Sequence, residues 1–212
     1  MRFFATASGP HVRDAIRTGH LGLIATPAGG CRLEDGTDWC ADNAIYAGRY
    51  PSDTAYLAWL SRRARYAARC AFATAPDDVG NAAATLARSM PMLEPIRAAG
   101  YPVALVAQDG LEDLQVPWNL IDAMFLGGTT PWKLGPAAAA LAAEARTRGL
   151  WVHMGRVNSR RRLHYAEAIG CHSADGTLLA FGPDRHLPSL LRWLADLTPP
   201  TSPLEHHHHA HT

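Results

Sequence analysis

The sequence has little of the material from which disulfide frameworks, zinc sites and membrane spans are built. It contains four cysteines in 212 residues, with no CxxC pair among them, so free thiols are expected rather than a zinc knuckle or a disulfide-stapled fold. No apolar run is long enough to cross a bilayer, and the opening run in MRFFATASGP is too short for a signal-peptide core. We therefore expect a cytoplasmic protein with no membrane association.

Neither sign of charge dominates, since 20 basic residues face 19 acidic ones and the net charge is +1. This balance argues against a strongly basic nucleic-acid-binding tail, although a local basic patch can still hold a polyanion. Every basic residue except Lys133 is arginine, a bias typical of a GC-rich genome. Hydrophobic residues make up 48% of the chain, enough for a domain with a substantial core.

The end of the chain differs from the rest in composition. Residues 199 to 212 read PPTSPLEHHHHAHT, which is typical of a flexible, tag-derived tail, with a native metal-binding tail as the alternative. The expected domain is therefore 1–198, and the tail histidines are left out of metal reasoning. We expect no bound metal and no cofactor.

Short apolar runs alternate with helical patterns along the domain. Helices are expected at 51–67, 78–99, 136–148, 159–168 and over a last segment, HLPSLLRWLADL, and glycines at 19, 100, 149 and 170 fall where helices should end. The eight apolar runs are 3–8, 21–27, 39–46, 70–76, 103–110, 123–129, 150–157 and 169–177.

Eight strand-and-helix units in this length predict a compact (β/α)8 TIM barrel of the α/β class. A doubly wound open sheet would show the same alternation and is the alternative. Nearly every run ends in polar residues or glycine, as in ADN, PDD, QDG, GGT, MGRVN and HSADGT. In a barrel these ends meet on one face, where catalytic groups collect, so the barrel is favoured.

Each of these endings also has a structural interpretation. Asp77 could be a helix N-cap, residues 108–110 a turn, and Gly127 and Gly128 a close packing contact or a phosphate cradle. Met154 is typical of a core, and His153 and His172 lack metal-ligand spacing, so satisfied histidines are expected. The arginines at 160–162 could form a solvated helix face. No single motif decides the function.

The order of the elements is more specific. The series ADNAIY, APDDVG, LVAQDG, FLGG, VHMGRVN and GCHSADGT, over residues 39 to 177, resembles the tRNA-guanine transglycosylase family, and more closely its compact relatives that place 7-deazaguanines in DNA. That family carries, in the same order, an Asp-x-Gly-Gly element, a second Asp, Val-Gln-Gly, Gly-Gly-Leu, Met-Gly and an Asp-x-Phe-Asp element that ends in the nucleophile.

The resemblance implies roles for individual residues. Asp175 matches the nucleophile and Asp42 the acid-base residue. The remaining matches bind the substrate: Asp77 and Gln108 hydrogen-bond the base, Gly127 and Gly128 face it with their backbone, Tyr46 and Met154 sandwich its ring, and Asn43 and His172 stand at family positions with altered residues.

The chemistry of base exchange is consistent with such a pair of carboxyl groups. Displacing a purine from C1′ passes through an oxocarbenium-like state that a carboxylate can capture as an ester, while a second carboxyl group moves the proton of the departing and incoming bases. Because C1′ is inaccessible in a stacked duplex, the nucleotide must be flipped out.

The chain also departs from the tRNA-acting pattern, because no cysteine follows Cys171 to form the Cys-x-Cys-x-x-Cys zinc site of their C-terminal subdomain. The resemblance therefore implies DNA as the polymer and a 7-deazaguanine such as 7-cyano-7-deazaguanine as the incoming base, with host cytoplasm as the location if a phage encodes the chain. Transfer RNA is the alternative polymer, and a catalytically silent binding subunit is the alternative to an enzyme. A homodimer or a partner subunit is compatible with either. The expected phosphate contacts are Arg156, Arg160, Arg161, Arg162 and Lys133.

Overall fold

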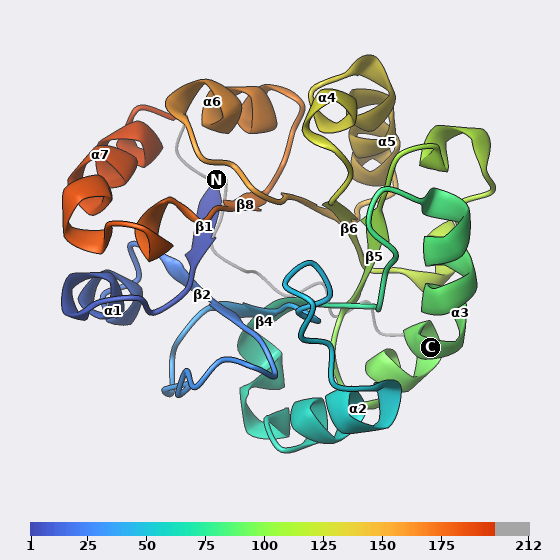
Figure 1. Cartoon of the computed structure of the whole chain (residues 1–212), viewed down its shortest axis with the longest axis horizontal. Coiled ribbons are helices and arrows are strands. Elements are labelled where there is room, and N and C mark those ends of the chain that lie inside the picture. Colours follow the sequence, from blue (N-terminus) through green and yellow to red (C-terminus); the bar gives the residue numbers. More distant parts are fainter. Residues whose placement is uncertain (198–212) are drawn as a thin grey trace.

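Eight short parallel strands pair in sequence order, and the last strand pairs with the first to close a barrel (Figure 1). The computed structural model describes residues 1–197; the predicted tail at 199–212 lies outside them. The predicted (β/α)8 barrel is confirmed, and the open-sheet alternative is wrong. The strands are β1 (Arg2–Ala5), β2 (Gly22–Ala25), β3 (Trp39–Ala41), β4 (Cys70–Thr74), β5 (Val103–Ala107), β6 (Ala123–Leu126), β7 (Trp151–Met154) and β8 (Ser173–Asp175).

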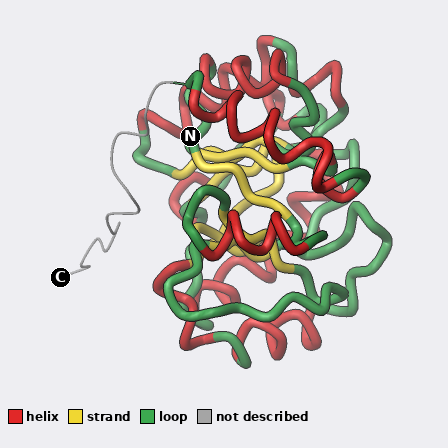
Figure 2. Tube along the Cα trace, turned by 90° about the vertical axis from the view of Figure 1, so that its left-hand side faces the viewer, coloured by secondary structure: helices red, strands yellow, loops and turns green. Residues whose placement is uncertain are grey.

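Helices surround the strands except at the connection from β2 to β3, residues 26–38, which is a loop (Figures 1 and 2). Short 3-10 helices occupy 64–69, 111–113, 118–120 and 178–180. The α-helices are α1 (Pro10–Arg17), α2 (Asp53–Ser61), α3 (Ala82–Ala98), α4 (Thr130–Lys133), α5 (Pro136–Thr147), α6 (Arg160–Ala168) and α7 (Pro183–Ala195).

The helix boundaries refine the sequence-based expectation. Helix α3 begins at Ala82 with Asn81 as its N-cap, whose side chain accepts a hydrogen bond from Ala84 N. Asp77 therefore does not cap helix α3, and its side chain is available for another role. The four glycines expected at helix ends all have positive φ, between 75° and 91°, the conformation that a helix-ending glycine adopts without a Cβ clash.

Side chains fill the barrel rather than leaving a pore. Phe72 contacts Phe4 and Phe125 edge to face, with ring centroids 6.2 and 6.0 Å apart. These rings belong to an inner cluster with Cys40, Val106 and several alanines, while a larger cluster lies between the strands and the helices. Because side chains alternate along a strand, strands such as β4 and β5 contribute residues to both clusters. The inner cluster forms the floor beneath the carboxyl ends of the strands.

We expect Phe72→Ala to lower the free energy of unfolding by about 3–5 kcal/mol, because it opens a cavity in the barrel floor. Phe181→Ala is the matched control: Phe181 is 85% exposed, so its loss should change stability by no more than about 0.5 kcal/mol. Chemical denaturation of both variants measures this. Equal effects would mean that the barrel interior does not carry the stability assigned to it.

Candidate active site

Asp42 directly follows β3 at the carboxyl end of the barrel. Its backbone N–H donates to Ala25 O (2.9 Å), and its Oδ1 accepts from the N–H of Ala44 (2.7 Å), which adopts φ 67°. Burial raises the pKa of Asp42 to about 7, the Ala44 N–H partly opposes this, and the charges of Asp175 and Asp77 raise it further. A carboxyl group with this pKa can both give and take a proton near neutral pH.

Asp77 follows β4 and lies in a buried network of amides. Its Oδ1 accepts from Asn43 Nδ2 (3.0 Å) and its Oδ2 from Gln108 Nε2 (2.7 Å). Asn43 is fixed in turn by Ala75 O (2.8 Å), and the Gln108 Oε1 accepts from Gly80 N (2.9 Å). Burial raises the pKa of Asp77, although both amides oppose the rise. The structure therefore brings these three predicted base-binding residues together, next to Asp42.

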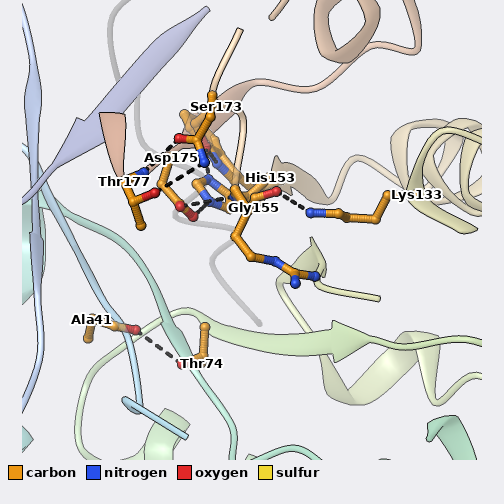
Figure 3. A network of polar contacts seen from close by, with 11 residues as sticks. Ala41, Thr74, Lys133, His153, Gly155, Ser173, Asp175 and Thr177 are labelled. Carbon is orange, nitrogen blue, oxygen red and sulfur yellow. Dashed lines mark hydrogen bonds and ion pairs between the residues drawn. The ribbon is translucent and has the colours of Figure 1, made fainter. Parts of the chain in front are cut away.

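Asp175 ends β8 and accepts hydrogen bonds on both carboxylate oxygens. Its Oδ2 lies 2.8 Å from His153 Nε2, and its Oδ1 accepts from the backbone N–H of Arg156 (3.1 Å). His153 also contacts Ser173 Oγ through Nδ1 (2.8 Å), and Figure 3 shows the three side chains meeting at one point. The side chain of Asp175 keeps 14% of its surface exposed, so the carboxylate can be reached from the barrel mouth.

Gly127 and Gly128 follow β6, and both of their N–H groups donate to Ala107 O, at 2.9 and 3.0 Å. An added Cβ would lie 2.5 Å from Val106 Cγ1 at Gly127 and 2.4 Å from Trp132 Cε3 at Gly128. These glycines are therefore required by close packing, and their N–H groups form no phosphate cradle. The carbonyl oxygens of these two glycines, rather than their N–H groups, are available to other side chains.

Those carbonyl oxygens are bound by Arg156. Its guanidinium donates to Gly127 O and Gly128 O and lies over the ring of Tyr46, with Cζ 4.5 Å from the ring centroid. Arg156 was expected to contact phosphate, but its planar side chain occupies the place in which the resemblance puts the base. Its φ of 60° is unusual for a residue other than glycine. Tyr46 is otherwise open, with 64% of its surface exposed.

Two predicted site residues are almost fully buried. Met154 is 1% exposed and belongs to the cluster between strands and helices, because alternation along β7 turns His153 inward and Met154 outward. The side chain of Met154 is therefore not turned toward the barrel mouth in this structure, and the expected sandwich with Tyr46 stays a prediction. Lys133 is 3% exposed and donates to Gly155 O (Figure 3). Burial, and then the charge of Arg156, lowers its pKa to about 7. The ammonium group of Lys133 is thus turned to a backbone carbonyl in this structure, and the expected phosphate contact stays a prediction.

His172 lies at the amino end of β8, away from the barrel mouth. Its Nδ1 accepts from Val152 N (2.9 Å), its Nε2 is 3.1 Å from Arg146 Nη1, and its ring stacks on Trp151 with centroids 4.9 Å apart. The three-residue strand separates it from the carboxyl end, where Asp175 lies. His172 has the hydrogen-bond partners that its interpretation as a satisfied histidine expects, and its contact with the base or sugar stays a prediction.

The arginine run opens α6 on the same face of the barrel as Asp175, since α6 follows the carboxyl end of β7. Arg161 is exposed. Arg160 pairs with Asp196 of α7 (Nη2 to Oδ2, 3.0 Å), and Arg162 lines a cavity of about 10 Å³ with Lys133 and Met154. Arg160 and Arg162 therefore interact with neighbouring parts of the protein. Of the three arginines, Arg161 is the most accessible to a polyanion.

His153 and Ser173 are the residues at this site to which the sequence analysis gave no role. His153 was interpreted as a satisfied buried histidine, and it is fully buried. The signal that could have assigned it is the two-residue period of the strands, which turns His153, Ser173 and Asp175 toward the barrel interior.

Within residues 1–197, no group of three histidine, cysteine or acidic side chains is arranged to hold a metal ion. The four cysteines are free. In the same range, no helix combines the length and the apolar character that crossing a membrane requires.

Comparison with known proteins gives the fold and no family. No family model and no curated protein matches the chain. Among solved structures, the Amycolatopsis orientalis BexX/CysO complex matches at 15% identity and a TM-score of 0.50, over 95% of this chain and 94% of that one. The PaMucR phosphodiesterase in complex with c-di-GMP matches at 14% identity and 0.44, over 68% and 67%. The Bacillus subtilis YkuI protein, with an EAL domain, matches at 12% and 0.44, over 90% of this chain and 50% of that one. At such identities the likeness concerns the barrel fold alone.

The raised pKa of Asp42 predicts a pH dependence of stability. Both folded and unfolded states hold the proton below about pH 3.8, whereas between about pH 4 and 7 only the folded state keeps it. The stability that this proton contributes is therefore greatest in acid and is lost as the pH rises through 7. Relative to Asp42→Asn, the wild type should lose on the order of a few kcal/mol over this window in denaturant unfolding. Parallel curves for the two proteins would contradict the raised pKa.

Proposed function

We propose that this chain is a guanine transglycosylase, which exchanges guanine in DNA for a 7-deazaguanine through a covalent sugar ester of Asp175. The observation that carries the proposal is the pairing of two carboxyl groups with different surroundings. Asp175 accepts two hydrogen bonds, which suits a nucleophilic carboxylate, whereas Asp42 has a pKa raised to about 7. The separation of such environments is a usual basis for assigning an acid-base residue and a nucleophile.

The reaction then runs in two displacements. An oxygen of Asp175 forms a bond to C1′ while the bond from C1′ to N9 of guanine breaks, and the departing base takes the proton of Asp42. The incoming 7-deazaguanine gives a proton to the Asp42 carboxylate and attacks C1′, and the ester bond to Asp175 breaks. Two inversions retain the configuration of the sugar.

The buried amide network supports a base site beside this pair. The Asp77 carboxylate has lone pairs beyond those that Asn43 and Gln108 use, and a carboxylate is the natural acceptor for the N1 and N2 hydrogens of guanine. The exposed ring of Tyr46 offers a stacking surface for a flipped base. The carbonyls of Gly127 and Gly128, now bound by Arg156, offer acceptors to the same ligand.

DNA is the polymer that we propose, and its support comes from the exposed arginine on α6 and from the resemblance to the compact relatives that act on DNA. Transfer RNA is the alternative substrate. A silent binding subunit is the alternative role, since such a protein would bind nucleic acid at the same face without exchange.

Asp175→Asn should abolish exchange by on the order of a thousandfold or more while free-base binding persists, because the amide keeps the shape but cannot form the ester. The measurement is mass spectrometry of nucleosides from DNA and from tRNA after incubation with protein and 7-cyano-7-deazaguanine. Activity within tenfold of wild type would move the nucleophile elsewhere. Exchange into tRNA above that into DNA would replace the polymer, and no exchange by the wild type on either would favour the binding subunit.

Arg156→Ala should bind free 7-cyano-7-deazaguanine on the order of tenfold more tightly than wild type, since the guanidinium that competes for the base position is removed. Alanine keeps the Cβ, so the backbone strain at φ 60° is unchanged. Calorimetric titration measures the affinity, with Arg161→Ala as the matched control, because Arg161 is exposed and lies outside the base position. An unchanged affinity in Arg156→Ala would contradict the assigned position of the base.

A further inference from the structure

His153 is a fully buried histidine in the aromatic floor of the barrel. The rings of Phe125, Phe72 and Phe4 surround it, with centroids 4.5, 5.0 and 6.1 Å from the imidazole. Packing of this kind leaves the ring a single orientation, in which Nε2 faces Asp175 and Nδ1 faces Ser173. A histidine buried among aromatic rings costs free energy unless both of its ring nitrogens have hydrogen-bond partners. Packing alone therefore does not explain a histidine at this position.

The partners form a directed chain of hydrogen bonds. Trp151 Nε1, which can only donate, lies 2.8 Å from Ser173 Oγ. The serine hydroxyl then has its own hydrogen to give to His153 Nδ1 (2.8 Å), which leaves the ring proton on Nε2 to be donated to Asp175 Oδ2 (2.8 Å). Every polar atom in this chain is satisfied with a neutral imidazole, so the network assigns the Nε2–H tautomer.

We propose that His153 is a positioning residue for Asp175, oriented by Ser173 and Trp151, and that it acts by donating its Nε2–H to the carboxylate. This inference rests on the proposed role of Asp175 as the nucleophile. The proton stays on His153 throughout. Its bond to Oδ2 holds the carboxylate toward C1′ before attack, and it stabilises the negative charge that returns to Asp175 when the incoming base breaks the ester.

Orienting the carboxylate before attack and stabilising its charge afterwards both affect kcat and the amount of ester that accumulates. Loss of the Nε2–H donor should misplace the carboxylate and slow turnover on the order of a hundredfold in kcat. Since His153 lies beneath Asp175 and has no exposed surface, the KM for the base should change little. Breakdown of the ester should suffer most, because that is the step in which the carboxylate regains its charge, so more of the enzyme should be trapped as the ester.

The test compares three substitutions of His153. In Gln the side-chain amide nitrogen mimics Nε2 and can reach Asp175, whereas in Asn it mimics Nδ1 and cannot. Phe fits the aromatic surroundings without any donor. We expect His153→Gln to keep kcat within about tenfold of wild type and the Asn and Phe variants to fall about a hundredfold, with near-constant KM. Intact-protein mass spectrometry after quenching reports the fraction of ester, and thermal unfolding reports folding.

The outcomes separate this inference from the proposed function. If wild type forms no ester at Asp175, the proposed function fails. If wild type forms the ester and the three variants turn over alike, or lose kcat in step with a loss of folded protein, the positioning role is overturned. Should His153→Phe fail to fold, the comparison of Gln with Asn decides: equal activity in these two overturns the role, and a tenfold or larger advantage of Gln supports it.

Discussion

The pairing of β8 with β1 is the constraint on which the candidate site depends. In its register Phe4 lies opposite Asp175, so the last strand of the chain is placed beside the first, and the carboxyl ends of β3, β4 and β8 face a common mouth. Closure brings Asp175 near enough to Asp42 for its charge to raise the pKa of Asp42. In an open sheet of the same strands, the ends of the third and eighth strands would lie apart, and neither carboxyl group would sense the other.

Closure of the barrel also buries these carboxyl groups, and neighbouring residues compensate by donating hydrogen bonds to them. Carboxyl groups near a floor of aromatic rings are poorly hydrated, so each needs hydrogen-bond donors to remain charged. Asp77 receives two amides and Asp175 an imidazole and a backbone N–H. Asp42 accepts from the backbone N–H of Ala44, and burial prevails there, which keeps its proton up to about pH 7. Burial raises the pKa of Asp77 as well, so the two amide donors there limit the effect of burial without cancelling it.

Much of this arrangement could be predicted from the sequence because it depends on the ends of strands. The apolar runs predicted eight strands, and the polar residues that follow them were therefore expected at the carboxyl end of the barrel. These residues include Asp42, Asp77, Gln108 and Asp175. The sequence was less informative where the direction of a side chain mattered. Met154 and His172 are near the right strands, yet the two-residue period turns Met154 outward and the length of β8 sets His172 at the far end.

The partners of the arginines and the lysine were not predicted for a different reason, because long side chains can reach partners that sequence spacing does not reveal. Lys133 turns inward to the carbonyl of Gly155, and Arg160 turns along the surface to Asp196. Counting basic residues on a rim therefore overestimates how many can meet a phosphate. Burial and pairing decide this, and both depend on helices α4 and α7, whose packing the local sequence does not encode.

Arg156 contacts two different parts of the candidate site, one through its backbone and the other through its side chain. Its N–H binds Asp175, and its guanidinium binds the carbonyls of Gly127 and Gly128 beneath Tyr46. Holding both contacts requires the left-handed φ of 60°, a strain of the kind that persists at functional sites when surrounding contacts determine it. Under the proposed function, a base enters between Tyr46 and these carbonyls only when the guanidinium leaves. Since the N–H belongs to the backbone, that movement can free the base position without releasing Asp175, which separates binding of the base from the orientation of the carboxylate.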